Sequence, residues 1–288
     1  MSSTAFPRRD LLRAVGGLAA GSAAGAESLR SYGVKVIDAH AHLHHRGRPT
    51  WREDDQKLID AADRLGIDQL CCSILPPERP TTLEGFRECN RWMAEALGRF
   101  PGRVLGYVFV NPGYTREALE EVRRYVGSHG FIGIKLYNDY RADEPVLWPL
   151  VELAIELGVP ILHHAGHARW LPQPQPRISD AGHLAVLARR YPEAMIICAH
   201  IAGGGDWEWT IKALRAAPSV YLDLSGSVID EGVVEMAVEE LGAERLLFAC
   251  DMSLAASVGR IRGAAVADAD KRKILGENIE RILARRRA

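Results

Sequence analysis

Neither sign of charge is in excess in this chain of 288 residues, which has 36 lysines and arginines and 37 aspartates and glutamates. General nucleic-acid binders need a basic surface that faces the phosphate backbone, so this balance argues against a nucleic-acid partner. The chain also lacks an uninterrupted apolar run of the roughly 20 residues that a membrane-spanning helix needs, and we expect no stable membrane insertion. Its hydrophobic fraction of 47% is instead typical of a globular protein with a sizeable core.

Cysteine is scarce, and the five cysteines form neither a CxxC pair nor a disulfide framework. Most of them lie in apolar runs, so we expect small buried side chains rather than metal ligands or nucleophiles. No glycine-rich dinucleotide fingerprint follows the first predicted strand, and no Walker A sequence occurs anywhere in the chain. These absences argue against cysteine chemistry, dinucleotide binding and P-loop phosphate binding.

The first 26 residues differ in composition from the rest of the chain. Arg8 and Arg9 precede an uncharged stretch rich in alanine and glycine, residues 14–26. This order resembles a twin-arginine export signal that ends in a small-residue cleavage site. We expect a periplasmic or extracellular protein if this signal functions, and a cytoplasmic protein with a disordered tail otherwise. Residues 1–26 are therefore predicted to be an extension outside the folded domain.

From residue 34 onward, short apolar runs alternate with longer amphipathic segments. The runs that we expect to be strands are 34–39, 69–75, 104–110, 131–136, 159–164, 195–200, 220–225 and 245–251. The segments that we expect to be helical are 52–65, 82–99, 115–128, 144–157, 179–191, 207–216, 230–241 and the final region 254–286. Strict alternation indicates parallel strands with helical crossovers, and eight strands are the number that closes a barrel. The sequence therefore predicts an α/β fold, a single (β/α)8 TIM barrel over residues 34–288.

Side chains that bind metals concentrate at the carboxyl ends of these strands, where barrel enzymes have their active sites. They are His40, His42, His163, His164, His200 and Asp251. His40 and His42 are two residues apart on one strand, so their side chains project to the same side. Imidazole and carboxylate together suit zinc, manganese, iron or nickel better than magnesium or calcium. Only a closed barrel would bring these distant residues together, so the predicted fold and the predicted metal site support each other.

These residues and their neighbours resemble the amidohydrolase superfamily, and specifically its amidohydrolase-related branch (amidohydrolase family 2) of metal-dependent hydrolases and decarboxylases. The resemblance runs from about residue 34 to the C-terminus. The segments that carry it are VIDAHAH (36–42), GFIGIKL (130–136), PILHHAG (160–166), AHIAGG (199–204), LFACD (247–251) and ILGEN (274–278).

The resemblance implies that His40, His42, His164 and Asp251 bind one divalent metal, for which we expect zinc, with manganese, iron or nickel as alternatives. The register of the 160–166 segment puts His164 at the ligand position, and the neighbouring His163 then faces outward. In the binuclear branch the counterpart of His200 binds a second ion, and a carboxylated lysine bridges the two. Lys135 lies at the matching place, so a second metal held by Lys135 and His200 stays an alternative to a lysine that binds substrate.

The resemblance implies a metal-dependent hydrolase, in which metal-activated water attacks the carbonyl of a small ester, lactone or amide. Asp251 would take the proton of that water, and His200 would act as acid, base or electrostatic catalyst. The first alternative is a metal-dependent non-oxidative decarboxylase or hydratase that acts on a carboxylated substrate, aromatic ones included. The second is a barrel that binds a ligand without catalysis, although no expected metal ligand is missing from the sequence.

Candidate substrate-binding residues follow two of the strands. They are Lys135, Tyr137 and Asn138 around the end of the fourth strand, and His167, Arg169 and Trp170 after the fifth. Arg169 beside Trp170 could hold an acidic or aromatic substrate, but a solvated arginine beside a packed tryptophan is an equal alternative. We expect a small molecule as the substrate, and a homo-oligomer is open.

Overall fold

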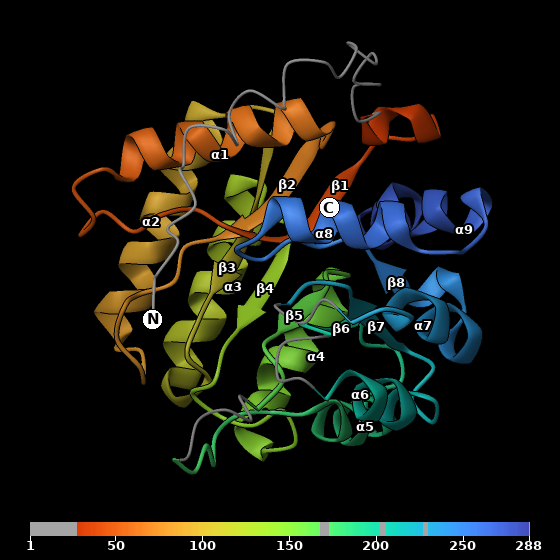
Figure 1. Ribbon diagram of the computed structural model, residues 1–288. Coiled ribbons are helices and arrows are strands. Elements are labelled where there is room, and N and C mark those ends of the chain that lie inside the picture. Colours follow the sequence, from red (N-terminus) through yellow and green to blue (C-terminus); the bar gives the residue numbers. More distant parts are fainter. Residues whose placement is uncertain (1–27, 168–172, 202–205, 227–229, 288) are drawn as a thin grey trace, which may run out of the picture.

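The computed structural model describes residues 28–167, 173–201, 206–226 and 230–287, and here the chain forms the predicted barrel. Eight parallel strands pair in chain order, and the helices lie on the outside of the strands (Figure 1). The strands are β1 (Ile37–His42), β2 (Gln69–Ser73), β3 (Val104–Phe109), β4 (Gly133–Leu136), β5 (Ile161–His163), β6 (Ile196–Cys198), β7 (Val220–Asp223) and β8 (Leu246–Leu247).

Each strand leads into a helix, as the alternating pattern predicts. The helices are α1 (Trp51–Leu65), α2 (Leu83–Arg99), α3 (Thr115–His129), α4 (Trp148–Leu157), α5 (Ala181–Arg190), α6 (Trp207–Leu214), α7 (Val233–Leu241), α8 (Leu254–Gly263), α9 (Asp268–Arg272) and α10 (Asn278–Leu283). Local signals explain several ends. The Thr82 hydroxyl accepts a hydrogen bond from the Gly85 N–H at the start of α2, and α1 ends at Gly66, whose φ is +82°.

The barrel closes because the chain beyond the short strand β8 pairs with β1. The Ala39 N–H donates to the Phe248 carbonyl at 2.9 Å, and the Asp251 N–H donates to the His40 carbonyl at 2.6 Å. A parallel bridge between Ala41 and Asp251 continues this contact. The first and last strands therefore meet, and this contact brings the end of β8 beside the histidines of β1.

The interior of the barrel is a cluster of buried apolar residues from alternate strand positions. Its strand members include Ile37, Ala39, Cys71, Tyr107, Leu162, Ile197 and Leu247. The intervening residues, such as Leu70 and Val108, belong to the larger cluster that packs under the helices. All five cysteines are buried and free, as expected from their apolar surroundings.

A register shift in β1 turns the histidines into the mouth of the barrel. Asp38 pairs with Leu70, but Ala41 pairs with Cys72, so β1 holds one residue more than β2 between these pairs. Because of this bulge, Ala39 and His40 are successive residues that both face inward. The alternation before the bulge would otherwise direct His40 outward.

Most of the predicted strands and helices are a few residues longer than those of the structure, and the largest strand difference is at β8, which was predicted over 245–251. The first strand begins at Ile37 rather than at residue 34, and it extends to His42. The final helical region is interrupted after α8, where the Ala265 N–H donates to the Glu235 carboxylate at 2.6 Å. The break follows Gly263, the last residue of α8, and glycine has a low helix propensity. No helix among the described residues is long and apolar enough to cross a membrane, and residues 1–26 lie outside the described residues.

Candidate metal centre

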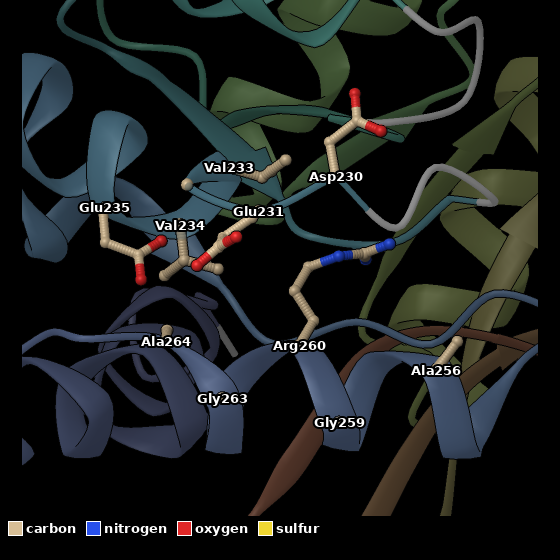
Figure 2. Close-up of a pocket in the computed structure, with 11 residues that line it drawn as sticks. Asp230, Glu231, Val233, Val234, Glu235, Ala256, Gly259, Arg260, Gly263 and Ala264 are labelled. Carbon is tan, nitrogen blue, oxygen red and sulfur yellow. The ribbon is translucent and has the colours of Figure 1, made fainter.

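One cavity lies beside the strand ends rather than at them. It has a volume of about 390 Å³ and lies between the start of α7 and α8, where Figure 2 shows Asp230, Glu235 and Arg260 around it. Its described lining has carboxylates but no imidazole. The Arg260 guanidinium donates to the carbonyls of Leu224 and Gly226 and so supports the end of β7. The expected metal ligands lie elsewhere, where the histidines meet.

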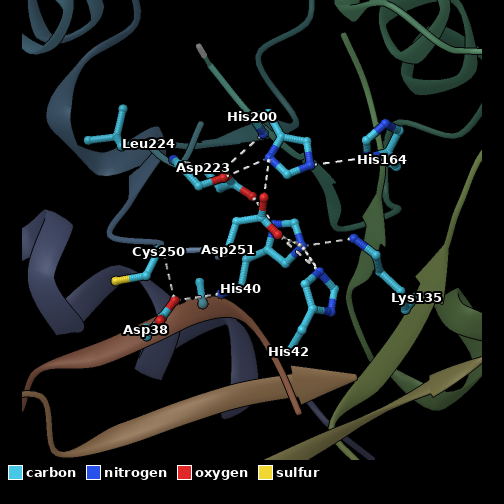
Figure 3. Close-up of polar contacts among 12 residues, drawn as sticks. Asp38, His40, His42, Lys135, His164, His200, Asp223, Leu224, Cys250 and Asp251 are labelled. Atoms are coloured by element: carbon cyan, nitrogen blue, oxygen red, sulfur yellow. Dashed lines mark hydrogen bonds and ion pairs between the residues drawn. The ribbon is translucent and has the colours of Figure 1, made fainter. Parts of the chain in front are cut away.

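His40, His42 and Asp251 meet at the carboxyl end of β1 and at the chain after β8 (Figure 3). The Nε2 atoms of the two histidines are 3.1 Å apart, and Asp251 Oδ1 lies 3.1 Å from His42 Nε2 and 3.8 Å from His40 Nε2. Ligand bonds of about 2.0–2.2 Å place neighbouring donors roughly 3–3.5 Å apart. The donor set of two imidazoles and one carboxylate thus fits a divalent transition metal.

A buried carboxylate on β7 orients His40. Asp223 Oδ2 accepts a hydrogen bond from His40 Nδ1 at 2.8 Å, and both side chains are fully buried. Burial, reinforced by the charge of Lys135, lowers the pKa of His40 to about 3, so the imidazole is neutral at pH 7. Burial alone would raise the pKa of Asp223, but the hydrogen bonds that it accepts from His40 and Ser225 hold that pKa below its usual range. A neutral imidazole whose Nδ1 is bonded to a carboxylate presents Nε2 to a metal.

His42 is oriented in the same way from β2. Its Nδ1 lies 3.3 Å from the Ser73 carbonyl and 3.1 Å from the Ser73 hydroxyl. Donation from Nδ1 to the carbonyl leaves a lone pair on Nε2. Both histidines therefore present the same nitrogen to the point where they meet Asp251.

His200 and Asp251 have a strained backbone. Their φ angles are 69° and 52°, and they are the two non-glycine residues with positive φ in the described part of the chain. Such conformations cost roughly 1–3 kcal/mol and persist where the surroundings hold them. The His200 N–H donates to Asp223 Oδ1 at 2.9 Å, and the Asp251 N–H donates to the His40 carbonyl. The strain falls on the two residues predicted to be catalytic.

The His200 side chain connects Ser225 to His164. Ser225 Oγ donates to Asp223 and accepts from His200 Nδ1 at 2.9 Å, so His200 Nε2 carries the lone pair. That nitrogen lies 3.1 Å from His164 Nδ1, and Asp251 Oδ2 lies 3.8 Å from His200 Nδ1. Burial lowers the pKa of both His164 and His200.

The structure places the four expected ligands in two positions. His40, His42 and Asp251 form one group whose ligand atoms lie within 4.8 Å of one another, whereas His164 contacts His200 and belongs to neither three-residue group found among the described residues. The second group is His40, His200 and Asp223. The register argument for His164 agrees with the structure, since Leu162 faces the interior and His163 therefore faces outward.

Lys135 enters the centre from β4. Its side chain is buried, and Nζ lies 2.9 Å from His40 Nε2. Burial lowers the pKa of Lys135 to about 8. The ammonium can donate to a substrate carboxylate, and a carboxylated Lys135 could instead bridge two ions, so the placement agrees with both alternatives.

Of the remaining substrate-binding candidates, the structure brings only some close to the metal centre. The Tyr137 ring lies 4.3 Å from the His164 ring, and Asn138 follows it on the same loop. His167 is tied to its own loop, since Nδ1 lies 2.7 Å from Asp180 Oδ1 and Nε2 lies 3.1 Å from the Gln175 carbonyl. Arg169 and Trp170 lie outside the described residues.

Sequence reasoning missed several residues of this site. They are Ser73, Arg79, Asp223 and Ser225. The strand-end argument could have found Asp223 and Ser225, because both lie at the carboxyl end of the predicted strand 220–225. Arg79 lies in a proline-rich loop without periodicity, and no pattern in the sequence indicates where its side chain points.

Comparison with known proteins agrees with this fold. The profile of a family described as Amidohydrolase matches residues 37–285. A gamma-resorcylate decarboxylase of Polaromonas sp. (strain JS666 / ATCC BAA-500) is 24% identical over 291 residues, which cover 78% of this chain and 87% of that protein.

Two solved structures have the same fold. A 2,6-dihydroxybenzoate decarboxylase in complex with 2,6-dihydroxybenzoate superposes with a TM-score of 0.71 at 18% identity, over 87% of this chain and 99% of that one. A dihydroxybenzoic acid decarboxylase from Polaromonas sp. JS666, with bound manganese and the inhibitor 2-nitroresorcinol, gives a TM-score of 0.69 at 20% identity, over 88% of this chain and 98% of that one.

Proposed function

Because this chain belongs to the amidohydrolase family, we propose that it is a metal-dependent enzyme that removes CO2 from a carboxylated aromatic substrate without oxidation. The observation that carries the proposal is Lys135, a buried cation whose Nζ lies 2.9 Å from His40 Nε2. A buried cation beside the candidate metal ligands suits a substrate that brings a carboxylate into the centre. The similar proteins described above are decarboxylases of hydroxylated benzoates, which supports the same reaction class.

Each side chain of the centre has its own role in this reaction. A divalent metal held by His40, His42 and Asp251 would supply a Lewis acid for the substrate oxygens. Lys135 donates to the substrate carboxylate and fixes its position. The bond between ring carbon and carboxylate carbon breaks, its electron pair stays on the ring carbon, and a proton takes the place of the CO2.

His200 is suited to carry that proton. Its Nδ1 is bonded to Ser225, so Nε2, which lies 3.1 Å from His164 Nδ1, is the nitrogen that can accept and release a proton. Asp251 lies 3.8 Å from the same ring and favours its protonated form through its negative charge. Asp251 and His200 thus act as the catalytic pair in this proposal, and Asp251 is also a ligand.

The predicted hydrolase is not confirmed, and the decarboxylase that the sequence offered as an alternative has the better support. Hydrolysis of an ester or lactone would use the same three ligands, with Lys135 on the carbonyl oxygen, but the similar proteins described above are decarboxylases. The hydratase alternative and the homo-oligomer stay predictions.

The metal that we propose is a single divalent ion. The manganese in one similar structure supports an ion that the sequence argument had named as an alternative to zinc. A second ion would require carboxylation of Lys135, which would replace the ammonium that the proposal uses. Export through the arginine-containing extension also stays a proposal, and N-terminal sequencing of secreted protein would test it.

The direct test is a reaction in D2O with metal-loaded protein. Hydroxylated benzoates and benzenedicarboxylates would be incubated with manganese-loaded and zinc-loaded protein, and CO2 and the aromatic product would be measured by mass spectrometry. We expect CO2 and one deuterium on the carbon that carried the carboxylate. Hydrolysis of phenyl esters or lactones without CO2 from any acid would contradict the proposal and support the hydrolase.

A further inference from the structure

Two arginines bind the backbone at the two ends of β7. At the start of the strand, Arg245 donates to the Val220 carbonyl from Nε at 3.1 Å and from Nη2 at 3.0 Å. Just beyond the other end, Arg260 donates from Nη1 to the Leu224 carbonyl and from Nη2 to the Gly226 carbonyl, the latter at 2.9 Å. The contacts of Arg260 therefore lie at the carboxyl end of the strand, which is the end that carries the metal centre.

The two carbonyls that Arg260 binds belong to the residues on either side of Ser225. Arg260 reaches them from α8, the helix that follows Asp251 (Figure 2). Leu224 and Ser225 are fully buried, and a buried carbonyl needs a hydrogen-bond donor. Loss of the guanidinium would remove a donor from both carbonyls and free this segment to move.

Ser225 in turn orients the imidazole of His200. The Ser225 N–H and hydroxyl both donate to Asp223 Oδ1, at 2.9 Å and 2.6 Å. The hydroxyl has then only its lone pairs left for the imidazole, so His200 Nδ1 must carry a hydrogen and donate it to Ser225 Oγ at 2.9 Å. The tautomer of His200 therefore depends on where Ser225 lies.

The charge of Arg260 acts on the same segment. Burial lowers the pKa of Arg260, and the negative charge of Asp223 opposes this effect. The guanidinium is charged at pH 7 and attracts the carboxylate that binds both Ser225 and His40 Nδ1. Charge and hydrogen bonds thus hold the end of β7 in one place.

The contact between Ser225 and His200 tolerates little movement. Hydrogen bonds weaken steeply as donor and acceptor separate, and a misplacement of about 1 Å can lower a catalytic rate by roughly a hundredfold. Two backbone contacts that flank Ser225 are well placed to prevent such a shift. Arg245 gives the same kind of support at the far end of β7, where no predicted catalytic residue lies.

We propose that Arg260 is a positioning residue for His200, whose imidazole it keeps in one tautomer through the backbone around Ser225. The inference rests on the proposed function for the role of His200, which is to deliver the proton that replaces the CO2. Arg260 acts through Ser225, whereas Arg245 stabilises the fold alone.

Steady-state rates separate these two roles. In metal-saturated Arg260→Gln, kcat for CO2 release should fall by about 10–100-fold. KM should change little, because Lys135, which binds the substrate carboxylate, is unaltered. Arg245→Gln is the matched control, since it removes a half-buried guanidinium that binds carbonyls of the same strand. It should lower the free energy of unfolding and keep the wild-type kcat.

An NMR spectrum of the imidazole tests the position without turnover. Long-range 1H–15N spectra of zinc-loaded protein distinguish the two tautomers, and His200→Asn identifies the signals of His200. We expect the hydrogen on Nδ1 in the wild type and in Arg245→Gln, and a mixture of tautomers in Arg260→Gln. Arg260→Lys keeps the charge but loses the planar fork, so it should show a smaller part of both effects. It carries the test if Arg260→Gln unfolds.

The outcomes separate this inference from the proposed function. Wild-type kcat and a single His200 tautomer in Arg260→Gln would overturn the inference and leave the proposed function intact. A fall in kcat that Arg245→Gln reproduces would also overturn it, because the cause would be a general loss of stability. A tautomer mixture confined to the Arg260 variants, in a protein that releases CO2 from no acid, would support the positioning of His200 and overturn the decarboxylase.

Discussion

The two halves of the barrel interior bury opposite kinds of side chain. Below the mouth, the interior is apolar, with Leu162, Ile197 and Leu247 in one cluster. At the mouth, the buried residues are imidazoles, carboxylates and an ammonium that are bonded to one another, as His40 is to Asp223 and Lys135. Burying such groups costs several kcal/mol unless each has a partner. Packing of the interior therefore stabilises the fold, whereas the buried polar groups at the mouth lower its stability and form an arrangement that suits a metal and a substrate.

The largest effect is expected from removal of two candidate ligands. His40→Ala together with His42→Ala should lower metal affinity and decarboxylation by at least about a thousandfold, because one carboxylate remains in the group of three. Metal competition titration and a CO2 assay would measure both. His129→Ala removes an exposed histidine at the end of α3 and serves as the control. Unchanged metal affinity in the double variant would contradict the site.

A substitution in the apolar half of the interior should instead lower the free energy of unfolding. Leu162→Ala creates a cavity in the interior cluster and should destabilise the fold by about 2–5 kcal/mol, as measured by urea denaturation. The metal affinity of the folded protein should change little. Val186→Ala, at a more exposed position on α5, should cost no more than about 0.5 kcal/mol. If the free energy of metal binding changed by as much as the free energy of unfolding, the two halves of the barrel would not be independent.

A residue that only supports a ligand should have a smaller effect on the metal. Asp223→Asn keeps the size of the side chain but removes the charge beside His40, and metal affinity should fall by about 10–100-fold. The comparison variant is Asp63→Asn, which changes an exposed carboxylate paired with Arg103. Wild-type affinity in Asp223→Asn would mean that the hydrogen bond to His40 does not orient the imidazole.

The smallest effect on metal affinity is expected where a metal-binding histidine loses one hydrogen-bond partner and keeps another. Ser73→Ala removes the hydroxyl beside His42 but keeps the backbone carbonyl, so metal affinity should fall by roughly 2–10-fold, the equivalent of one neutral hydrogen bond. Ser128→Ala, an exposed change on α3, should have no effect. A loss as large as that of Asp223→Asn would show that the Ser73 hydroxyl holds His42 alone.

The barrel could be predicted from the sequence because its signal is periodic. Eight apolar runs alternate with helical segments, and all eight became strands in chain order. The same rule located His40, His42, His200 and Asp251, because strand ends meet at one end of any barrel. The part of the site that depends on chain order and strand position could therefore be predicted from the sequence.

The rest depends on geometry that the sequence pattern does not carry. The bulge in β1 makes Ala39 and His40 both face inward, against the strict alternation of a strand. Positive φ at His200 and Asp251 arises from tertiary hydrogen bonds, for which these residue types give no signal. Arg79 reaches Tyr137 from a loop whose path depends on its neighbours in space.

The most direct test of a metal centre at the polar end is elemental analysis of protein purified without a chelator. The account predicts about one manganese, zinc, iron or nickel ion per chain. About two ions per chain would contradict the single ion and require a carboxylated Lys135. Protein that carries no metal and takes up none when it is added would contradict the central claim.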